Sequence, residues 1–139
     1  MFDVKSSTGR IYVKGVVDYE LMSQYSLWIE ASQSGTSQAS SYAEVVIAIE
    51  DENDNKPRFS QTVYNVDIME NSNFGSTVLT VTATDADSGL NGDVTYSLTG
   101  KDAASFRIDD TGTIITFTKL DRELIDKYSL TVIAKDMVQ

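Results

Sequence analysis

The stretch Asp51-Glu52-Asn53-Asp54-Asn55-Lys56-Pro57 places five acidic or amide side chains in a row and ends on a proline. Calcium prefers about six to eight oxygen ligands, which Asp, Glu, Asn and backbone carbonyls supply. A run of this kind in isolation is most simply a solvated turn, because turns favour Asp, Asn and Pro. Two further acidic pairs, Asp18/Glu20 and Asp85/Asp87, lie beside strand-like segments on either side of it. Together the three clusters favour a cation-binding site.

The calcium loop of an EF-hand is excluded by its spacing. That loop needs Gly at its sixth position and Glu at its twelfth. Counting from Asp51, these two positions hold Lys56 and Thr62. Calcium bound by this stretch must therefore be held by a different arrangement of ligands.

The composition narrows the possible functions. The chain has 139 residues, of which 41% are hydrophobic, enough for one domain or parts of two. Its 11 basic and 21 acidic residues give a net charge of −10, which disfavours nucleic acid and anionic membranes as partners. Cys and His are absent, so disulfides, thiol chemistry and the commonest general base are excluded. These absences predict that the chain is not an enzyme.

The secondary-structure signal is β throughout. Five segments largely alternate apolar with small or polar residues, which is the period of half-buried strands. They are residues 25–31, 43–49, 76–83, 93–98 and 128–134. Gly, Asn, Asp and Ser separate such segments at the spacing typical of a β-sandwich. Trp28 and the other aromatic side chains are predicted to lie in its core.

An internal repeat is the strongest organisational feature of the chain. A shift of 103 residues aligns three motifs and one further residue without a gap. The aligned pairs are Thr8-Gly9-x-Ile11 with Thr111-Gly112-x-Ile114, Asp18-x-Glu20-Leu21 with Asp121-x-Glu123-Leu124, Tyr25-Ser26-Leu27 with Tyr128-Ser129-Leu130, and Ala31 with Ala134. A period of this length corresponds to a whole sandwich domain rather than to a solenoid repeat. The sequence therefore predicts parts of two similar domains joined at the acidic stretch.

Five motifs in this order resemble the extracellular repeats of the cadherin family. They are Asp51-x-Asn53-Asp54-Asn55-x-Pro57 with Phe59 following, Met69-Glu70-Asn71, Asp85-Ala86-Asp87-Ser88-Gly89-Leu90-Asn91-Gly92, Leu120-Asp121-Arg122-Glu123, and Ala134-Lys135-Asp136. The motifs cover both halves of the chain. The resemblance implies an all-β fold in which tandem repeats, each a Greek-key, immunoglobulin-like β-sandwich, are joined by a calcium-binding linker.

The resemblance also implies a division into domains. Residues 1–50 match the C-terminal part of one repeat, residues 51–55 match the linker, and residues 56–139 match a second repeat that lacks its last strand. The first part matches only the last four strands of a repeat, so the chain is expected to be a fragment of a longer ectodomain. Half a sandwich buries little surface, and we therefore expect the main core in residues 56–136.

Three calcium ions are implied at the junction between the two repeats. Their expected ligands are Asp18 and Glu20 from the first repeat, Asp51, Glu52, Asn53, Asp54 and Asn55 from the linker, and Asp85, Asp87, Asn91 and Asp136 from the second repeat. Glu52, Asn55 and Asn91 would contribute backbone carbonyls. Glu70, Asp121 and Glu123 match ligand positions for a further junction, whose other ligands the chain lacks.

Two positions depart from the family pattern. Tyr19 stands where an Arg is usual, although the flanking carboxylates Asp18 and Glu20 are kept. Gln33 stands at the position equivalent to Asp136. The second departure disfavours a full set of ions at the junction that precedes the first repeat.

The function implied by the resemblance is calcium-dependent cell-cell adhesion by the extracellular part of a plasma-membrane protein. The expected partners are other cadherin ectodomains, bound homophilically or heterophilically, with no nucleic acid, no small-molecule substrate and no membrane contact except through the parent protein. The alternative is a calcium-stabilised β-sandwich of a secreted carbohydrate-active enzyme. Such an enzyme needs two carboxylates facing each other across a cleft, whereas most of the prominent carboxylates here are explained as calcium ligands.

Overall fold

The computed structural model describes residues 1–33 and 39–136, and its regular structure is almost all β-strand. It contains two compact units, Met1–Glu52 and Asn53–Gln139. The division falls inside the predicted linker, residues 51–55, and residues 137–139 of the predicted second repeat lie outside the described part. Along the described residues, no helix is both long and apolar enough to cross a membrane.

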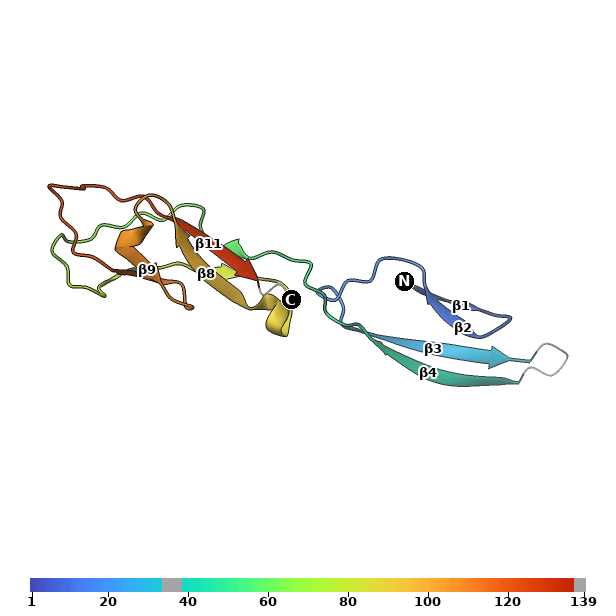
Figure 1. Cartoon of the computed structure of the whole chain (residues 1–139). Helices are drawn as coiled ribbons and strands as arrows, with labels where there is room; N and C mark the ends of the chain where they lie inside the picture. Colours follow the sequence, from blue (N-terminus) through green and yellow to red (C-terminus); the bar gives the residue numbers. More distant parts are fainter. Residues whose placement is uncertain (34–38, 137–139) are drawn as a thin grey trace. The chain divides into compact units, whose positions relative to one another are not determined.

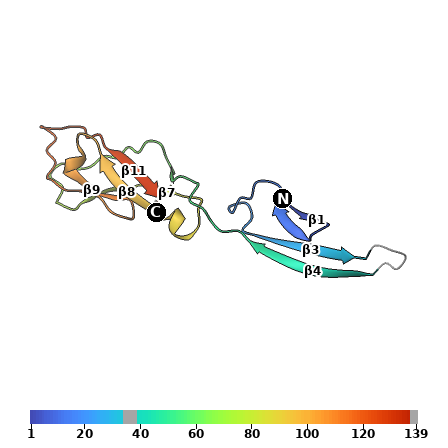
Figure 2. The same ribbon diagram turned by 45° about the vertical axis from the view of Figure 1, so that its right-hand side comes forward.

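The first unit is made of two antiparallel strand pairs. Its strands are β1 (Phe2–Lys5), β2 (Arg10–Val13), β3 (Gln24–Ser32) and β4 (Ser40–Ala48). β1 pairs with β2, and β3 pairs with β4 over nine residues (Figure 1; Figure 2). β3 and β4 confirm the strands predicted at 25–31 and 43–49, and the described part of this unit contains the four strands expected of it.

The β3–β4 pair has one apolar face and one polar face. Tyr25 lies opposite Ile47 and Leu27 opposite Val45, and all four are half-buried. The Phe2 ring packs edge-on against Tyr25, with 5.0 Å between the ring centroids. Because side chains alternate between the two faces of a strand, this face is the one that β1 covers.

Trp28 lies on the opposite face of β3 and is 70% exposed. The predicted core position of Trp28 is therefore wrong. The period-2 pattern that buries Tyr25 and Leu27 sends Trp28 to the other side of the sheet, next to Ser26 and Glu30. A strand pattern alone does not say which of its two faces an isolated aromatic residue belongs to.

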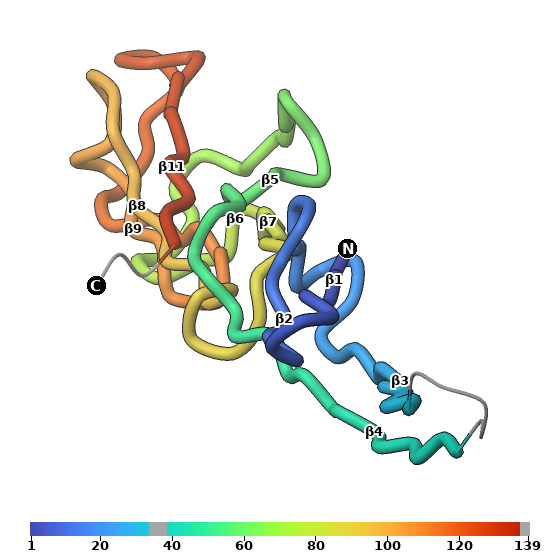
Figure 3. Tube along the Cα trace, turned by 90° about the vertical axis from the view of Figure 1, so that its right-hand side faces the viewer, coloured from blue at the N-terminus to red at the C-terminus, as the bar shows by residue number. Residues whose placement is uncertain are grey.

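The second unit contains the remaining strands. They are β5 (Arg58–Phe59), β6 (Thr77–Thr80), β7 (Ala83–Thr84), β8 (Val94–Thr99), β9 (Phe106–Ile108), β10 (Thr113–Thr116) and β11 (Thr131–Asp136), with 3-10 turns at η1 (Gly89–Gly92) and η2 (Ala103–Ser105). β8 pairs with β11, and the two strands lie side by side in Figure 1 and Figure 3. β10 lies between β6 and β9, and β5 pairs with β7; all of these pairs are antiparallel.

The core of the second unit is formed by Val81, Phe106, Ile114 and Leu120, which are each 3% exposed or less. Half-buried aromatic residues pack against it, namely Phe59, Tyr64, Tyr96 and Tyr128. Every buried residue in the described part of the chain belongs to this unit. The main core thus lies where the sequence predicts it, within residues 56–136.

The prediction of a core role for all aromatic residues fails at four further positions: Tyr42 is 63% exposed, Phe74 68%, Tyr12 42% and Phe117 38%. Tyr42 lies on the polar face of β4, where its hydroxyl donates to Glu30. Phe74 packs against Phe117 outside the core cluster, with 5.2 Å between the ring centroids and the ring planes tilted by 52°.

Two predicted strands are shorter than expected. The segment 76–83 is interrupted after β6 because its hydrogen bonds change partner: Val81 N donates to Gly112 O, and Thr82 O accepts from Ser60 N. The segment 128–134 becomes regular only at β11. Ser129 N donates to the side chain of Asp102 at 2.7 Å instead of joining a ladder.

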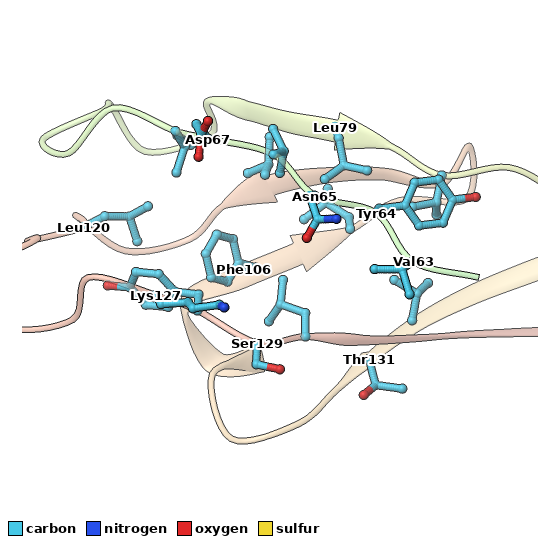
Figure 4. Close-up of a pocket in the computed structure, with 18 of the residues that line it drawn as sticks. Val63, Tyr64, Asn65, Asp67, Leu79, Phe106, Leu120, Lys127, Ser129 and Thr131 are labelled. Atoms are coloured by element: carbon cyan, nitrogen blue, oxygen red, sulfur yellow. The ribbon is translucent and has the colours of Figure 1, made fainter. Parts of the chain in front are cut away.

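An open cleft of about 1010 Å³ leads to the core of the second unit. Its walls come from residues 59–68 on one side and 125–132 on the other. The core residues Phe106 and Leu120 line it as well (Figure 4). Among the described residues β11 pairs with β8 alone. β3 is the strand of the first unit that the internal repeat aligns with β11, and it pairs with β4. The equivalent strands of the two units therefore have different pairing partners.

Candidate metal centres

The carboxylate of Asp87 is nearly buried and accepts hydrogen bonds through both of its oxygens. Asp87 is 8% exposed, and its two oxygens accept from Asn55, Oδ2 from the backbone N at 3.2 Å and Oδ1 from Nδ2 at 2.6 Å. Asn55 Nδ2 also donates to Asp54 Oδ1 at 2.9 Å. Asn55, the last residue of the predicted linker, is therefore hydrogen-bonded to the loop that follows β7.

Asp85 contacts Asp87 through only one of its two carboxylate oxygens. Its Oδ1 accepts from Asp87 N at 3.0 Å, whereas its Oδ2 is buried and has no hydrogen-bond donor among the described residues. A buried carboxylate oxygen without a donor is costly unless a cation or water satisfies it. The pair thus has the electrostatic character of a cation site.

The loop after Asp87 is closed tightly by Gly92. A Cβ placed at Gly92 would lie 2.3 Å from the backbone oxygen of Asp87, so any larger residue would displace the loop. Asn91 belongs to the same 3-10 turn as Gly92, η1, and its N donates to Ser88 O at 3.2 Å. Asp136, the last predicted ligand of this unit, ends β11 opposite Val94.

In the first unit, a turn carries the predicted ligands Asp18 and Glu20. Asp18 Oδ1 accepts from Leu21 N at 3.0 Å, and Asp18 O accepts from Met22 N at 3.1 Å. A carboxylate oxygen of Glu20 lies within 4.8 Å of one of Asp51. Two carboxylates at that separation repel each other unless a cation lies near both.

A second acidic cluster brings together Glu70, Asp121 and Glu123, whose carboxylate oxygens lie within 4.8 Å of one another. Glu70 Oε2 accepts from Arg122 N at 3.2 Å, and Asp121 Oδ1 accepts from Glu123 N at 3.0 Å. All three are exposed. The structure therefore groups the three residues that the sequence assigns to a further junction.

The ligand roles of all these residues, and of Glu52, Asn53 and Asp54, remain predictions from the sequence. The side chain of Asn55 was missed, because the family pattern assigns that residue only through its carbonyl. The signal that points to its side chain is chemical: an amide beside a nearly buried carboxylate is a suitable donor to it.

The fold and the acidic clusters together define an all-β protein of antiparallel strands with grouped carboxylates. Comparison with known proteins gives the family. The cadherin domain model matches residues 1–50 and 64–139. The chain belongs to the cadherin family.

Several relatives support this assignment over almost the whole chain. Mouse protocadherin Fat 4 is 42% identical over 137 residues, and human cadherin-23 is 43% identical over 128 residues. These alignments cover 97% and 91% of this chain but only 3% and 4% of the relatives. The chain therefore spans a small part of the length of the relatives that it matches.

Solved structures have the same fold as this chain. The crystal structure of mouse cadherin-23 EC22-24 superposes with a TM-score of 0.90 at 36% identity, covering 97% of this chain and 43% of that one. Chicken VE-cadherin EC1-2 superposes with a TM-score of 0.78 at 33% identity, covering 97% and 68%. The fold class is thus the cadherin-type, immunoglobulin-like β-sandwich.

Proposed function

We propose that this chain is a calcium-dependent cell-cell adhesion module, part of the extracellular region of a longer plasma-membrane cadherin. Calcium would act as a mechanical element that stiffens the connection between successive repeats. The observation that carries the proposal is the buried oxygen Asp85 Oδ2, which has no donor among the described residues although it lies beside the nearly buried Asp87.

The donor set fits calcium rather than a softer metal. Calcium prefers carboxylate, amide and carbonyl oxygens, and the acidic segments contain no Cys or His, the usual zinc ligands. The ligands that we propose for the connection are Asp18, Glu20, Asp51, Glu52, Asn53, Asp54, Asn55, Asp85, Asp87, Asn91 and Asp136. Glu70, Asp121 and Glu123 are proposed as ligands for a further repeat.

The residues of the chain prepare the site before calcium arrives. Asn55 fixes the Asp87 carboxylate with two hydrogen bonds, and Gly92 permits the loop to close on the Asp87 backbone. When bound, calcium would supply positive charge that offsets the mutual repulsion of the carboxylates. Without it, the repulsion favours a loose linker.

The partners that we propose are other cadherin ectodomains, contacted homophilically or heterophilically. An enzymatic role is not favoured. A glycosidase needs a pair of carboxylates about 5–9.5 Å apart across a substrate cleft, and the exposed carboxylates that do come together, Glu70, Asp121 and Glu123, match cadherin ligand positions.

The stiffening can be tested by single-molecule energy transfer between dyes on the two units. The chain has no native Cys, so Ser7→Cys and Lys101→Cys, both at exposed positions, accept the dyes specifically. We expect a broad distance distribution in chelator and a narrow one in millimolar calcium. If calcium binding is demonstrated separately and the distance distribution does not change, the proposed mechanical role is wrong, whereas the proposed calcium site still holds.

A further inference from the structure

The polar face of β3 and β4 carries a two-by-two arrangement of aromatic and acidic side chains. Trp28 lies opposite Glu44, and Glu30 lies opposite Tyr42. Residues two apart on a strand share a face, so all four project from the same side, and aromatic and acidic residues alternate both along and across the strands. We call these four residues the Trp28 quartet.

The aromatic members of the quartet are open to solvent. Trp28 is 70% exposed and Tyr42 is 63% exposed. The apolar contact with β1 forms on the other face, through Tyr25. Trp is the residue most often enriched at the energetic centre of protein interfaces, and an exposed Trp on a regular strand is therefore informative.

The acidic members are held in place by neighbours. Ser26 Oγ donates to Glu44 Oε1 at 2.5 Å, and Tyr42 Oη donates to Glu30 Oε1 at 3.0 Å. Hydrogen bonds from Ser40 and Tyr42 lower the pKa of Glu30. Both carboxylates are thus oriented beside the aromatic rings before any partner arrives.

No cation of this region neutralises the two carboxylates. The sequence contains no Lys or Arg between Lys14 and Lys56. The ion pairs found among the described residues are Lys14 with Asp3 and Lys101 with Asp102. The quartet therefore presents two oriented negative charges and a solvent-exposed indole ring, and residues 15–55 contain no basic side chain that could neutralise those charges.

We propose that the Trp28 quartet binds a basic, extended segment of a partner protein that carries Arg at alternate positions. A guanidinium stacks on an indole face and forms paired hydrogen bonds with a carboxylate. Glu30 and Glu44 occupy diagonal positions of the ladder, about 7–8 Å apart. Side chains two residues apart in an extended peptide are separated by about 6.5 Å, which matches that spacing.

A second copy of this chain is a poor occupant, because two molecules of net charge −10 repel each other. A basic partner is attracted instead. None of the four residues is among the proposed calcium ligands, so binding to the quartet is independent of the proposed adhesion mechanism and requires no calcium.

The single Trp of the chain makes the test direct, since Trp28 is the only source of indole emission. The probe is the peptide Arg-Thr-Arg-Thr-Arg, titrated in chelator at low salt. We expect a saturable change in Trp28 emission that weakens as salt increases. The isomer Arg-Arg-Thr-Thr-Arg has the same charge but no two Arg residues at alternate positions, and it should bind several-fold more weakly.

The variant Glu30→Gln/Glu44→Gln removes the charges while retaining side chains that accept hydrogen bonds, and it should weaken binding about tenfold, a change suited to two exposed charge pairs. The matched control Asp110→Asn/Asp126→Asn removes two exposed charges from the second unit and should change the affinity less than twofold. Absence of saturation, equal binding of the two peptides, or equal weakening in both variants would overturn the proposal.

Discussion

Asn55 and Asp87, which are 32 residues apart, are joined by two hydrogen bonds that use both oxygens of the Asp87 carboxylate. Hydrogen bonds to a charged group contribute about 1.5–3 kcal/mol each. Asn55→Ala removes the side-chain donor from a carboxylate that is 8% exposed. The variant should therefore lower the free energy of unfolding by about 1.5–3 kcal/mol in chelator, measured by urea denaturation. Asn65→Ala, at an exposed position, is the control and should change it by less than about 0.5 kcal/mol.

Asp87 and Asp18 should differ in their contribution to calcium binding. Asp87 is nearly buried and lies beside Asp85, whose Oδ2 is buried without a donor among the described residues, whereas Asp18 is exposed. The resemblance to cadherin repeats also implies that Asp87 would contribute to two of the three proposed ions. Asp87→Asn should therefore reduce total calcium binding more than Asp18→Asn in a calorimetric titration. The reverse order would show that the ligand assignment is wrong.

The two units should differ in their protection from amide exchange. Every buried residue among those described lies in the second unit, and local opening becomes easier where burial is low. Amides of β3 and β4 should exchange faster than those of β8 and β10. Comparable protection in both units would mean that the open face of the first unit is covered in solution, for example by a second molecule.

The core of the second unit gives a prediction about stability. Phe106 is 3% exposed and packs edge-on against Tyr128, with ring centroids 5.3 Å apart. Phe106→Ala should lower the free energy of unfolding by about 3–5 kcal/mol. The matched control Phe74→Ala removes a ring that is 68% exposed, so only its contact with Phe117, about 0.5–1.5 kcal/mol, should be lost. Equal losses in urea denaturation would contradict the position of the core.

The sequence predicts the class of fold because two independent patterns agree. The alternation of apolar residues indicates strands, and the internal repeat predicts two related domains. The structure places β2 (Arg10–Val13) and β10 (Thr113–Thr116) at positions that differ by that same shift of 103 residues. Local periodicity and long-range repetition were both visible in the sequence, so this part of the fold could be predicted.

Other features depend on contacts that local patterns do not encode. Trp28 alternates correctly with its neighbours, yet only the packing of Phe2 on Tyr25 decides which face of β3 is covered. The late start of β11 depends on a bond from Ser129 to Asp102, a residue far away in the sequence. The candidate ligands were predictable as residue types, whereas the Asn55 side chain required the folded loop.

The central claim, that this cadherin chain binds calcium in its folded state, is tested most directly by thermal unfolding in millimolar calcium and in chelator. A ligand that binds only the folded state at a hundredfold excess over its dissociation constant stabilises it by about 2.7 kcal/mol. We predict a clear rise of the unfolding midpoint in calcium, and a smaller rise in the Asp87→Asn variant. An identical midpoint in calcium and in chelator would contradict the account.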